Sequence, residues 1–123
     1  MYERILVGTD GSKTAAKAVD RAVSVAATAG AQLTIFSAAR AAKGDEVVAA
    51  EAARHAGSGV EIETKVVDTD PVSGLIEEAR TGGFDLLVMG NKGMTGVTRF
   101  LKGSVPNKVA HHLPCSLLIV KTT

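Results

Sequence analysis

The stretch Phe84–Ser104, with the sequence FDLLVMGNKGMTGVTRFLKGS, joins an apolar run to a glycine-rich segment. Leu86–Met89 is continuously apolar, as expected of a buried parallel strand, and Gly90, Gly93 and Gly103 follow it. Glycine lets a backbone approach a ligand closely and adopt positive φ, and successive N–H groups in such a loop form a concave anion site. The stretch therefore predicts a strand leading into a phosphate-binding loop. The alternative is a glycine-rich surface loop.

Charge is divided unevenly along the chain. The part from Leu86 to Thr123 holds five Lys or Arg and no Asp or Glu, so it carries +5, whereas residues 1–85 carry −4. The net charge of +1 gives no general case for nucleic acid or a membrane surface as a partner, and we expect neither. Lys92 and Arg99 lie in the glycine-rich stretch and are candidates to bind phosphates.

Length and composition limit the class of protein. A chain of 123 residues predicts one domain, 1–123, and 46% hydrophobic residues suffice for a core. The single Cys115 excludes an intramolecular disulfide. No apolar run approaches the roughly 18 residues of a spanning helix, and the first residues do not resemble a signal peptide. We expect a cytoplasmic protein.

Strand and helix patterns alternate along the sequence. Apolar runs predict strands at Arg4–Thr9, Gln32–Ala38, Phe84–Met89 and Leu117–Lys121, and period-two alternation predicts an edge strand at Val60–Val66. Helices are expected after the N-caps Ser12 and Asp70, over Asp45–Ala56 and over Ser104–His112. Residues Arg40–Gly44 are expected to be a mobile connection. This alternation predicts an α/β domain with an open parallel sheet and right-handed crossovers.

The glycine-rich stretch resembles the nucleotide-binding signature of the universal stress protein family, Gly-x2-Gly-x9-Gly-(Ser/Thr), here Gly90, Gly93, Gly103 and Ser104. The opening RILVGTDGS (4–12) and the closing CSLLIV (115–120) are similar to the same family. The resemblance implies a Rossmann-like, five-stranded sheet of order 3-2-1-4-5 with helices on both faces. The ends of the first and fourth strands would then face one crevice, where ligands bind in such sheets.

Likeness to the ATP-binding branch of this family implies an ATP site, with Mg²⁺ held mainly through the phosphates. The implied nucleotide-binding residues are Gly8, Thr9, Asp10, Ala38, Met89, Gly90, Lys92, Gly93, Arg99, Gly103, Ser104 and Val105. Of these, Ala38 and Met89 would lie beneath and beside the adenine. Several have a structural alternative: Asp10 can bond its own turn, Ser104 can cap a helix, and Ala38 and Met89 can be ordinary core.

Cyclic AMP is the alternative ligand, because Gly103–Pro106 and Ile119–Thr123 look like actinobacterial members similar to cyclic-nucleotide binders. The segment after the second strand is shorter than the family pattern, which leaves open what covers the adenine. The sequence contains no P-loop and no dinucleotide-binding glycine pattern, and neither a nucleophile nor a general base is recognisable beside the glycines. We therefore expect a nucleotide-dependent regulatory module with no catalytic residue; slow ATP hydrolysis or self-phosphorylation stays an alternative.

The last strand is expected to mediate assembly. Leu117, Leu118, Ile119 and Val120 are apolar in succession, which predicts cover on both faces, and an apolar strand at a sheet edge invites pairing. The family forms dimers through this strand, so the resemblance implies a homodimer. Which regulatory protein would receive the signal is not identifiable from the sequence.

Overall fold

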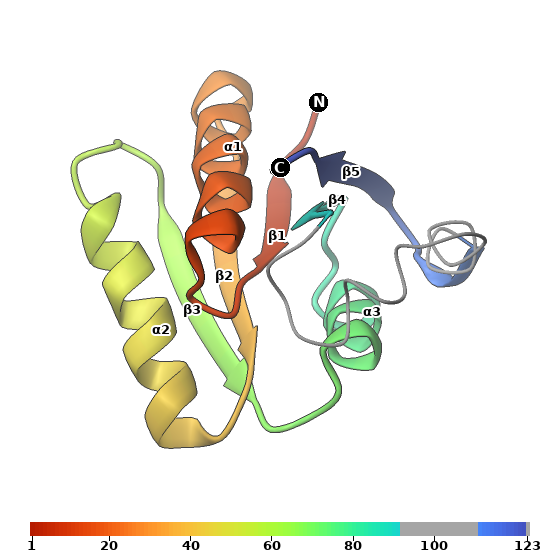
Figure 1. The fold of residues 1–123 in the computed structure, drawn as a ribbon. Helices are drawn as coiled ribbons and strands as arrows, with labels where there is room; N and C mark the ends of the chain where they lie inside the picture. Colours follow the sequence, from red (N-terminus) through yellow and green to blue (C-terminus); the bar gives the residue numbers. More distant parts are fainter. Residues whose placement is uncertain (92–110, 123) are drawn as a thin grey trace.

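The computed structural model describes residues 1–91 and 111–122 (Figure 1). Its elements, in chain order, are β1 (Arg4–Gly8), α1 (Lys13–Ala29), β2 (Gln32–Ala38), α2 (Ala41–Arg54), β3 (Ile62–Val67), α3 (Pro71–Thr81), β4 (Leu86–Gly90) and β5 (Ser116–Val120). All strand pairs are parallel, and the sheet order is β3-β2-β1-β4-β5. The predicted α/β class and strand order are confirmed.

The helix boundaries follow local capping chemistry. Ser12 Oγ accepts a hydrogen bond from the N–H of Ala15 at 3.1 Å, and α1 ends at Gly30 with φ +68°. Asp70 Oδ2 accepts from the N–H of Ser73 at 3.1 Å, and Pro71 occupies the first turn of α3. These caps are where the sequence predicts them. The predicted helix Ser104–His112 lies outside the described residues except for its last two.

The prediction that Arg40–Gly44 forms a mobile connection is wrong, because α2 begins at Ala41. The carbonyl of Arg40 accepts a hydrogen bond from the N–H of Gly44 at 2.8 Å, so this segment is already the first helical turn. Gly44 is buried there and lies directly against Val66 of β3, with no room for a Cβ. Close packing on β3 therefore compensates for the low helix propensity of glycine.

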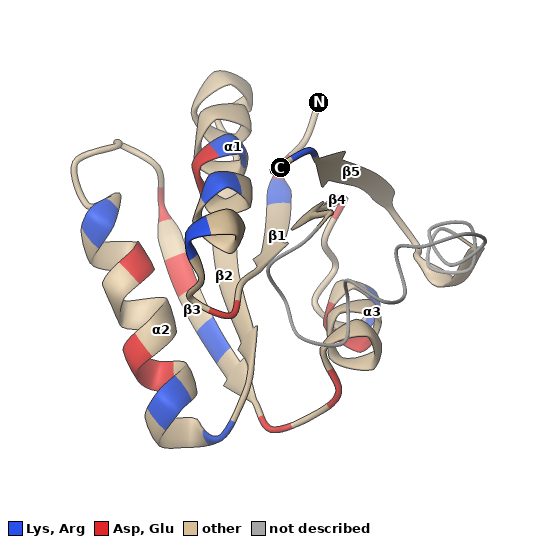
Figure 2. Cartoon of the chain, in the orientation of Figure 1, with Lys and Arg blue, Asp and Glu red and all other residues tan. Residues whose placement is uncertain are grey.

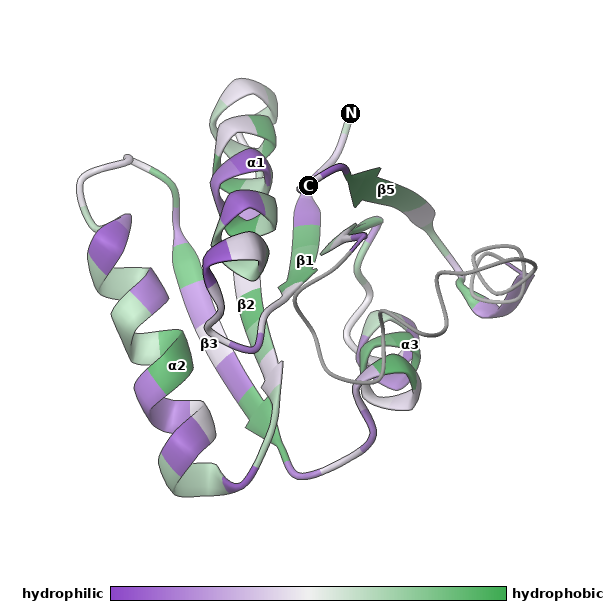
Figure 3. Cartoon of the chain, in the orientation of Figure 1, coloured by the Kyte–Doolittle hydropathy of each residue, from purple (hydrophilic) through white to green (hydrophobic). Residues whose placement is uncertain are grey.

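Two apolar layers enclose the sheet. On one face, α1 and α2 cover the buried side chains of Ile5, Val7, Leu33, Ile35 and Val88. On the other face, α3 covers the cluster that holds Leu6, Phe36, Leu75, Leu87 and Met89. Alternate residues of each strand thus point to opposite faces, as the pleat requires. Hydrophobic colour runs along β5 as well (Figure 3), although Ile119 is 36% exposed and Leu117 and Leu118 are only half-buried.

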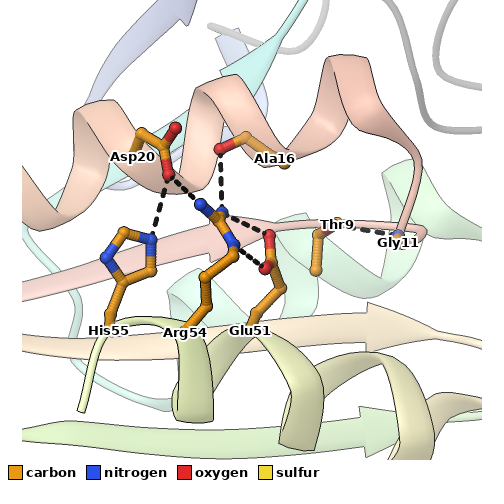
Figure 4. Close-up of polar contacts among 7 residues, drawn as sticks. All are labelled: Thr9, Gly11, Ala16, Asp20, Glu51, Arg54 and His55. Atoms are coloured by element: carbon orange, nitrogen blue, oxygen red, sulfur yellow. Dashed lines mark hydrogen bonds and ion pairs between the residues drawn. The ribbon is translucent and has the colours of Figure 1, made fainter.

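A polar network joins α1 to α2 (Figure 4). Arg54 binds Glu51 at 2.6 Å and Asp20 at 2.7 Å, and its Nη2 donates to the carbonyl of Ala16 at 3.3 Å. His55 Nε2 lies 3.0 Å from Asp20 Oδ1. The side-chain hydrogen bond to Glu51 is the largest of the causes that raise the pKa of Arg54 above its ordinary value, so Arg54 stays charged. The network fixes the position of α2 relative to α1.

Candidate functional site

A hollow of about 170 Å³ lies at the carboxyl ends of β1 and β2. Its lining residues are Thr9, Asp10, Ser37, Ala38, Ala39, Lys43, Val47 and Pro71. Larger depressions lie beside α1 and near the amino ends of the strands. We favour the smaller hollow because the strand order reverses between β1 and β4, and open parallel sheets bind ligands at the carboxyl ends of the strands beside that reversal.

The wall from β1 is a rigid turn. The N–H of Thr9 donates to the carbonyl of Phe36 at 2.9 Å, and Thr9 Oγ1, fully buried, accepts from the N–H of Gly11 at 3.1 Å (Figure 4). Asp10 Oδ1 accepts from the N–H of Ser12 at 2.9 Å, which confirms its structural role in the turn. Gly11 has φ +85°, and a Cβ there would lie 3.0 Å from Val47 Cγ2, so only glycine suits the position.

The end of β4, where the glycine-rich segment begins, is held by polar contacts. The N–H of Asn91 donates to the carbonyl of Val120 at 3.0 Å, and Asn91 Oδ1 accepts from Thr122. Lys17 Nζ of α1 then donates to the carbonyl of Thr122 at 3.1 Å. The starting point of the segment is therefore fixed by β5 and α1 together. Sequence reasoning did not assign a role to Asn91, Lys17 or Thr122.

The described part brings some of the predicted site residues together. Thr9, Asp10 and Ala38 line the hollow, while Gly8 lies one residue back in β1 and Gly90 ends β4. Met89 packs in the core on the α3 side of the sheet and is 1% exposed. Its core role is therefore seen directly, whereas contact with a base stays a prediction. The predicted residues Lys92, Gly93, Arg99, Gly103, Ser104 and Val105 lie outside the described residues.

Lys43, Val47 and Pro71 line the hollow without having been predicted to do so. Lys43 and Val47 are four residues apart and thus share one face of α2. This spacing could have indicated them if the helix had been predicted to begin before Asp45. Pro71 was assigned only as the first residue of α3.

Other chemical groups in the described part of the chain give no second site. Within residues 1–91 and 111–122, no cluster of three His, Cys, Asp or Glu could hold a metal ion. Burial, followed by the nearby Asp85 carboxylate, raises the pKa of the Cys115 thiol, so the thiol is protonated near neutral pH and is a poor nucleophile. No described helix is both long and apolar enough to cross a membrane.

A parallel α/β sheet of this order, with a hollow at the carboxyl ends of β1 and β2 and a glycine-rich stretch of sequence directly after β4, has the features of a class of ligand-binding domain. The model of the universal stress protein family matches residues 1–45 and 36–121, and the chain belongs to that family.

Individual relatives agree with this membership. Universal stress protein Rv1636 of Mycobacterium tuberculosis (strain ATCC 25618 / H37Rv) is 37% identical over 145 residues, covering 99% of this chain and 98% of the relative. Universal stress protein YxiE of Bacillus subtilis (strain 168) is 28% identical, covering 98% and 100%. Among solved structures, a universal stress protein in complex with cAMP is 38% identical with a TM-score of 0.83, covering 99% and 98%.

The chain is shorter than its alignment with the mycobacterial relative, and the family model matches it in two overlapping segments. The alignment with the mycobacterial relative runs over 145 residues, whereas this chain has 123. The two matched segments overlap at residues 36–45, which span the end of β2 and the start of α2. Only Ala39 and Arg40 join these two elements here. The short connection brings the first turn of α2 directly beside the end of β2.

Proposed function

We propose that this protein binds an adenine nucleotide at the carboxyl ends of β1, β2 and β4 and acts as a nucleotide-dependent regulatory module in the stress response. One observation carries the proposal: the hollow lined by Thr9, Asp10 and Ala38 lies at the carboxyl ends of β1 and β2, and the signature glycines begin at the end of β4, on the other side of β1, where the strand order reverses.

The hollow suits the base rather than the whole nucleotide. Pockets for complete drug-sized ligands have volumes of about 300–1,000 Å³, which exceeds the 170 Å³ present here. Ala38, Val47 and Pro71 supply apolar walls for a ring, and Asp10 supplies an acceptor. The ribose and phosphates would extend from the hollow toward the residues that follow Gly90.

The preferred ligand is ATP, with Mg²⁺ held mainly through its phosphates. Support comes from the intact Gly90, Gly93, Gly103 and Ser104 set, together with five cations and no acid from Leu86 onward. Cyclic AMP is the second candidate, and the 38% identical structure that contains cAMP favours it. We assign no catalytic residue. We propose a cytoplasmic location and a homodimer formed through β5 as part of the same hypothesis.

The test is calorimetry on nucleotide-free protein with Mg-ATP and with cyclic AMP, at low and at physiological salt. We expect ATP affinity to fall steeply with salt, because a triphosphate carries more charge than one cyclic phosphate and added ions screen each attraction. Cyclic AMP binding at least tenfold tighter than Mg-ATP at physiological salt would reject ATP in favour of cyclic AMP. Absence of binding by both nucleotides would reject the nucleotide-binding function.

A variant pair tests the glycine-rich segment. Gly103→Val adds a side chain where we propose that backbone N–H groups approach the phosphates, so ATP affinity should fall by more than about tenfold, or about 1.4 kcal/mol. Gly57→Val adds the same side chain in the turn after α2, where a Cβ meets no atom within 4 Å. The control variant should keep wild-type affinity. Equal affinity of the Gly103→Val protein and wild type would remove this segment from the site.

A further inference from the structure

Lys43 is a cation in the first turn of α2, and the short β2–α2 connection places this turn beside the hollow. It lies in the first turn of α2, next to Gly44, and the packing of Gly44 on Val66 holds this turn close to the sheet. Its side chain is exposed yet lines the hollow, together with Val47 one turn later. In Figure 2 cations lie at both ends of α2, and its N-terminal end is the one nearest the carboxyl end of β2.

The surroundings of Lys43 leave its charge available. No described carboxylate lies within ion-pairing distance of its ammonium, whereas Lys65 pairs with Glu78 and Arg54 pairs with Glu51 and Asp20. A lysine can lay its methylene groups along an apolar wall and keep its ammonium at the wet mouth of a pocket. The stem would then cover the hollow beside Val47, and the ammonium would lie at its rim.

We infer that Lys43 is a nucleotide-contacting residue that donates a hydrogen bond to the base or ribose held in the hollow. This inference rests on the proposed function and goes beyond the glycine signature. An ammonium offers three donors and no acceptor, whereas the carboxylate of Asp10 only accepts. The hollow therefore presents a donor from α2 and an acceptor from β1 to a ligand fragment that carries both kinds of group.

A contact at the base has a different consequence from a contact at the phosphates. A cation that binds phosphate gains attraction with each added negative charge. A hydrogen bond to the base or ribose is instead the same whether the nucleotide carries one phosphate or three. Loss of Lys43 should therefore weaken AMP, ADP and ATP by a similar factor.

The experiment measures the affinities of AMP, ADP and ATP for nucleotide-free Lys43→Met protein by calorimetry. Methionine keeps most of the apolar stem and removes the donors. Arg21→Met is the matched control, because Arg21 is an exposed cation of α1 that lines none of the described hollows. We expect at least fivefold weaker binding of all three nucleotides to Lys43→Met, a smaller loss for Lys43→Arg, and wild-type affinity for Arg21→Met.

Two insertions test the role of the short connection independently. Gly-Ser-Gly inserted after Ala39 would separate the first turn of α2 from β2, whereas the same insertion after Ser58 lengthens an exposed turn at the far end of α2. The first should reproduce the loss seen in Lys43→Met if the protein stays folded by circular dichroism, and the second should not.

The outcomes separate the inference from the proposed function. If wild type binds nucleotides and Lys43→Met binds them equally well, the inference is wrong and the proposed function stands. A loss that grows from AMP to ATP would place Lys43 on the phosphates and also overturn the inference. If wild type binds none of the three nucleotides and no cyclic AMP, the inference and the proposed function fail together. If it binds cyclic AMP alone, the same variants are compared with cyclic AMP, and equal affinity of Lys43→Met and wild type overturns the inference.

Discussion

Asn91 Oδ1 accepts two hydrogen bonds from Thr122, one from its N–H at 2.8 Å and one from its hydroxyl at 2.9 Å. Thr122 is 2% exposed and Asn91 is half-buried, so the contact is partly shielded from water. It joins the residue after β4 to the end of the chain beyond β5. Asn91, the residue directly after Gly90, is thereby fixed to the edge of the sheet that we propose as the dimer interface.

Removing the Thr122 hydroxyl should reduce stability. Thr122→Val deletes one of the two donors and keeps the N–H bond, so the free energy of unfolding should fall by about 1 kcal/mol. Asn91→Ala should cost more, because it leaves the buried hydroxyl without its partner. Urea denaturation measures both changes. Thr64→Val, on the exposed part of β3, is the control and should change stability little. If Thr122→Val and Asn91→Ala are as stable as the control Thr64→Val, the contact does not stabilise the fold.

Breaking the α1–α2 network should destabilise the protein independently of pH near neutrality. Arg54→Met leaves Glu51, whose side chain is 8% exposed, without its cation, at a cost of about 1–2 kcal/mol after allowance for the 40% exposure of Arg54. A basic side chain whose pKa is raised on folding stabilises the protein until the pH rises through that raised pKa. The pKa of Arg54 lies far above neutrality. Denaturation at about pH 7.5 and pH 9 should therefore give the same loss.

The matched control for Arg54 is Arg80, which pairs with Glu77 on the surface, where both side chains are about 60% exposed. Arg80→Met should have little measurable effect, because exposed ion pairs contribute little to stability. A loss for Arg80→Met as large as that for Arg54→Met would show that burial of Glu51 is not the cause.

Overpacking at Gly44 should test how closely α2 lies on β3. A methyl group there meets Val66 directly, and forcing such a contact costs about 1–3 kcal/mol, offset by about 1 kcal/mol of helix propensity. Gly44→Ala should thus lower the midpoint of thermal unfolding, and adding Val66→Ala should recover part of the loss. Gly57→Ala, where no atom lies within 4 Å, should leave the midpoint nearly unchanged. A more stable Gly44→Ala protein would show that α2 can move away from β3.

The edge strand β5 should control assembly if the proposed homodimer forms. Ile119 is 36% exposed, and Leu117 and Leu118 are half-buried at this edge. Ile119→Lys places a charge on the proposed interface, so the protein should become monomeric or insoluble. Light scattering at micromolar concentration distinguishes the species. Wild-type protein that is itself monomeric there would exclude the dimer.

The sequence predicts those parts of the fold that depend on local chemistry. Ser12 and Asp70 cap their helices as predicted, because capping needs only a side chain and the next turn. The apolar runs give the strands to within one or two residues, and their order came from the family resemblance. The start of α2 could not be predicted, since Gly44 is held in a helix by Val66, a contact across 22 positions that no periodicity reveals.

The residues of the candidate site likewise include some that the sequence predicts and some that it does not. Thr9, Asp10 and Ala38 could be predicted because the family resemblance implied them and because they stand where two parallel strands end. Lys43 could not, since its place in the hollow depends on a connection of only Ala39 and Arg40. The Asn91–Thr122 contact joins polar residues 31 positions apart, and polar pairs of that separation leave no pattern in the chain. The predicted cover of β5 on both faces is not complete in the described part, where Ile119 is exposed.

The position of β1 between β2 and β4 has a consequence for synthesis on the ribosome. Residues up to Thr81 already contain β1, β2, β3 and three helices, yet one side of β1 has no partner until Leu86–Gly90 has been made. During that interval the nascent chain presents the unpaired backbone of Ile5–Val7, whose side chains are fully buried in the finished fold. Such an edge recruits other chains, so a ribosome stalled after α3 would release a fragment that aggregates or occupies a chaperone.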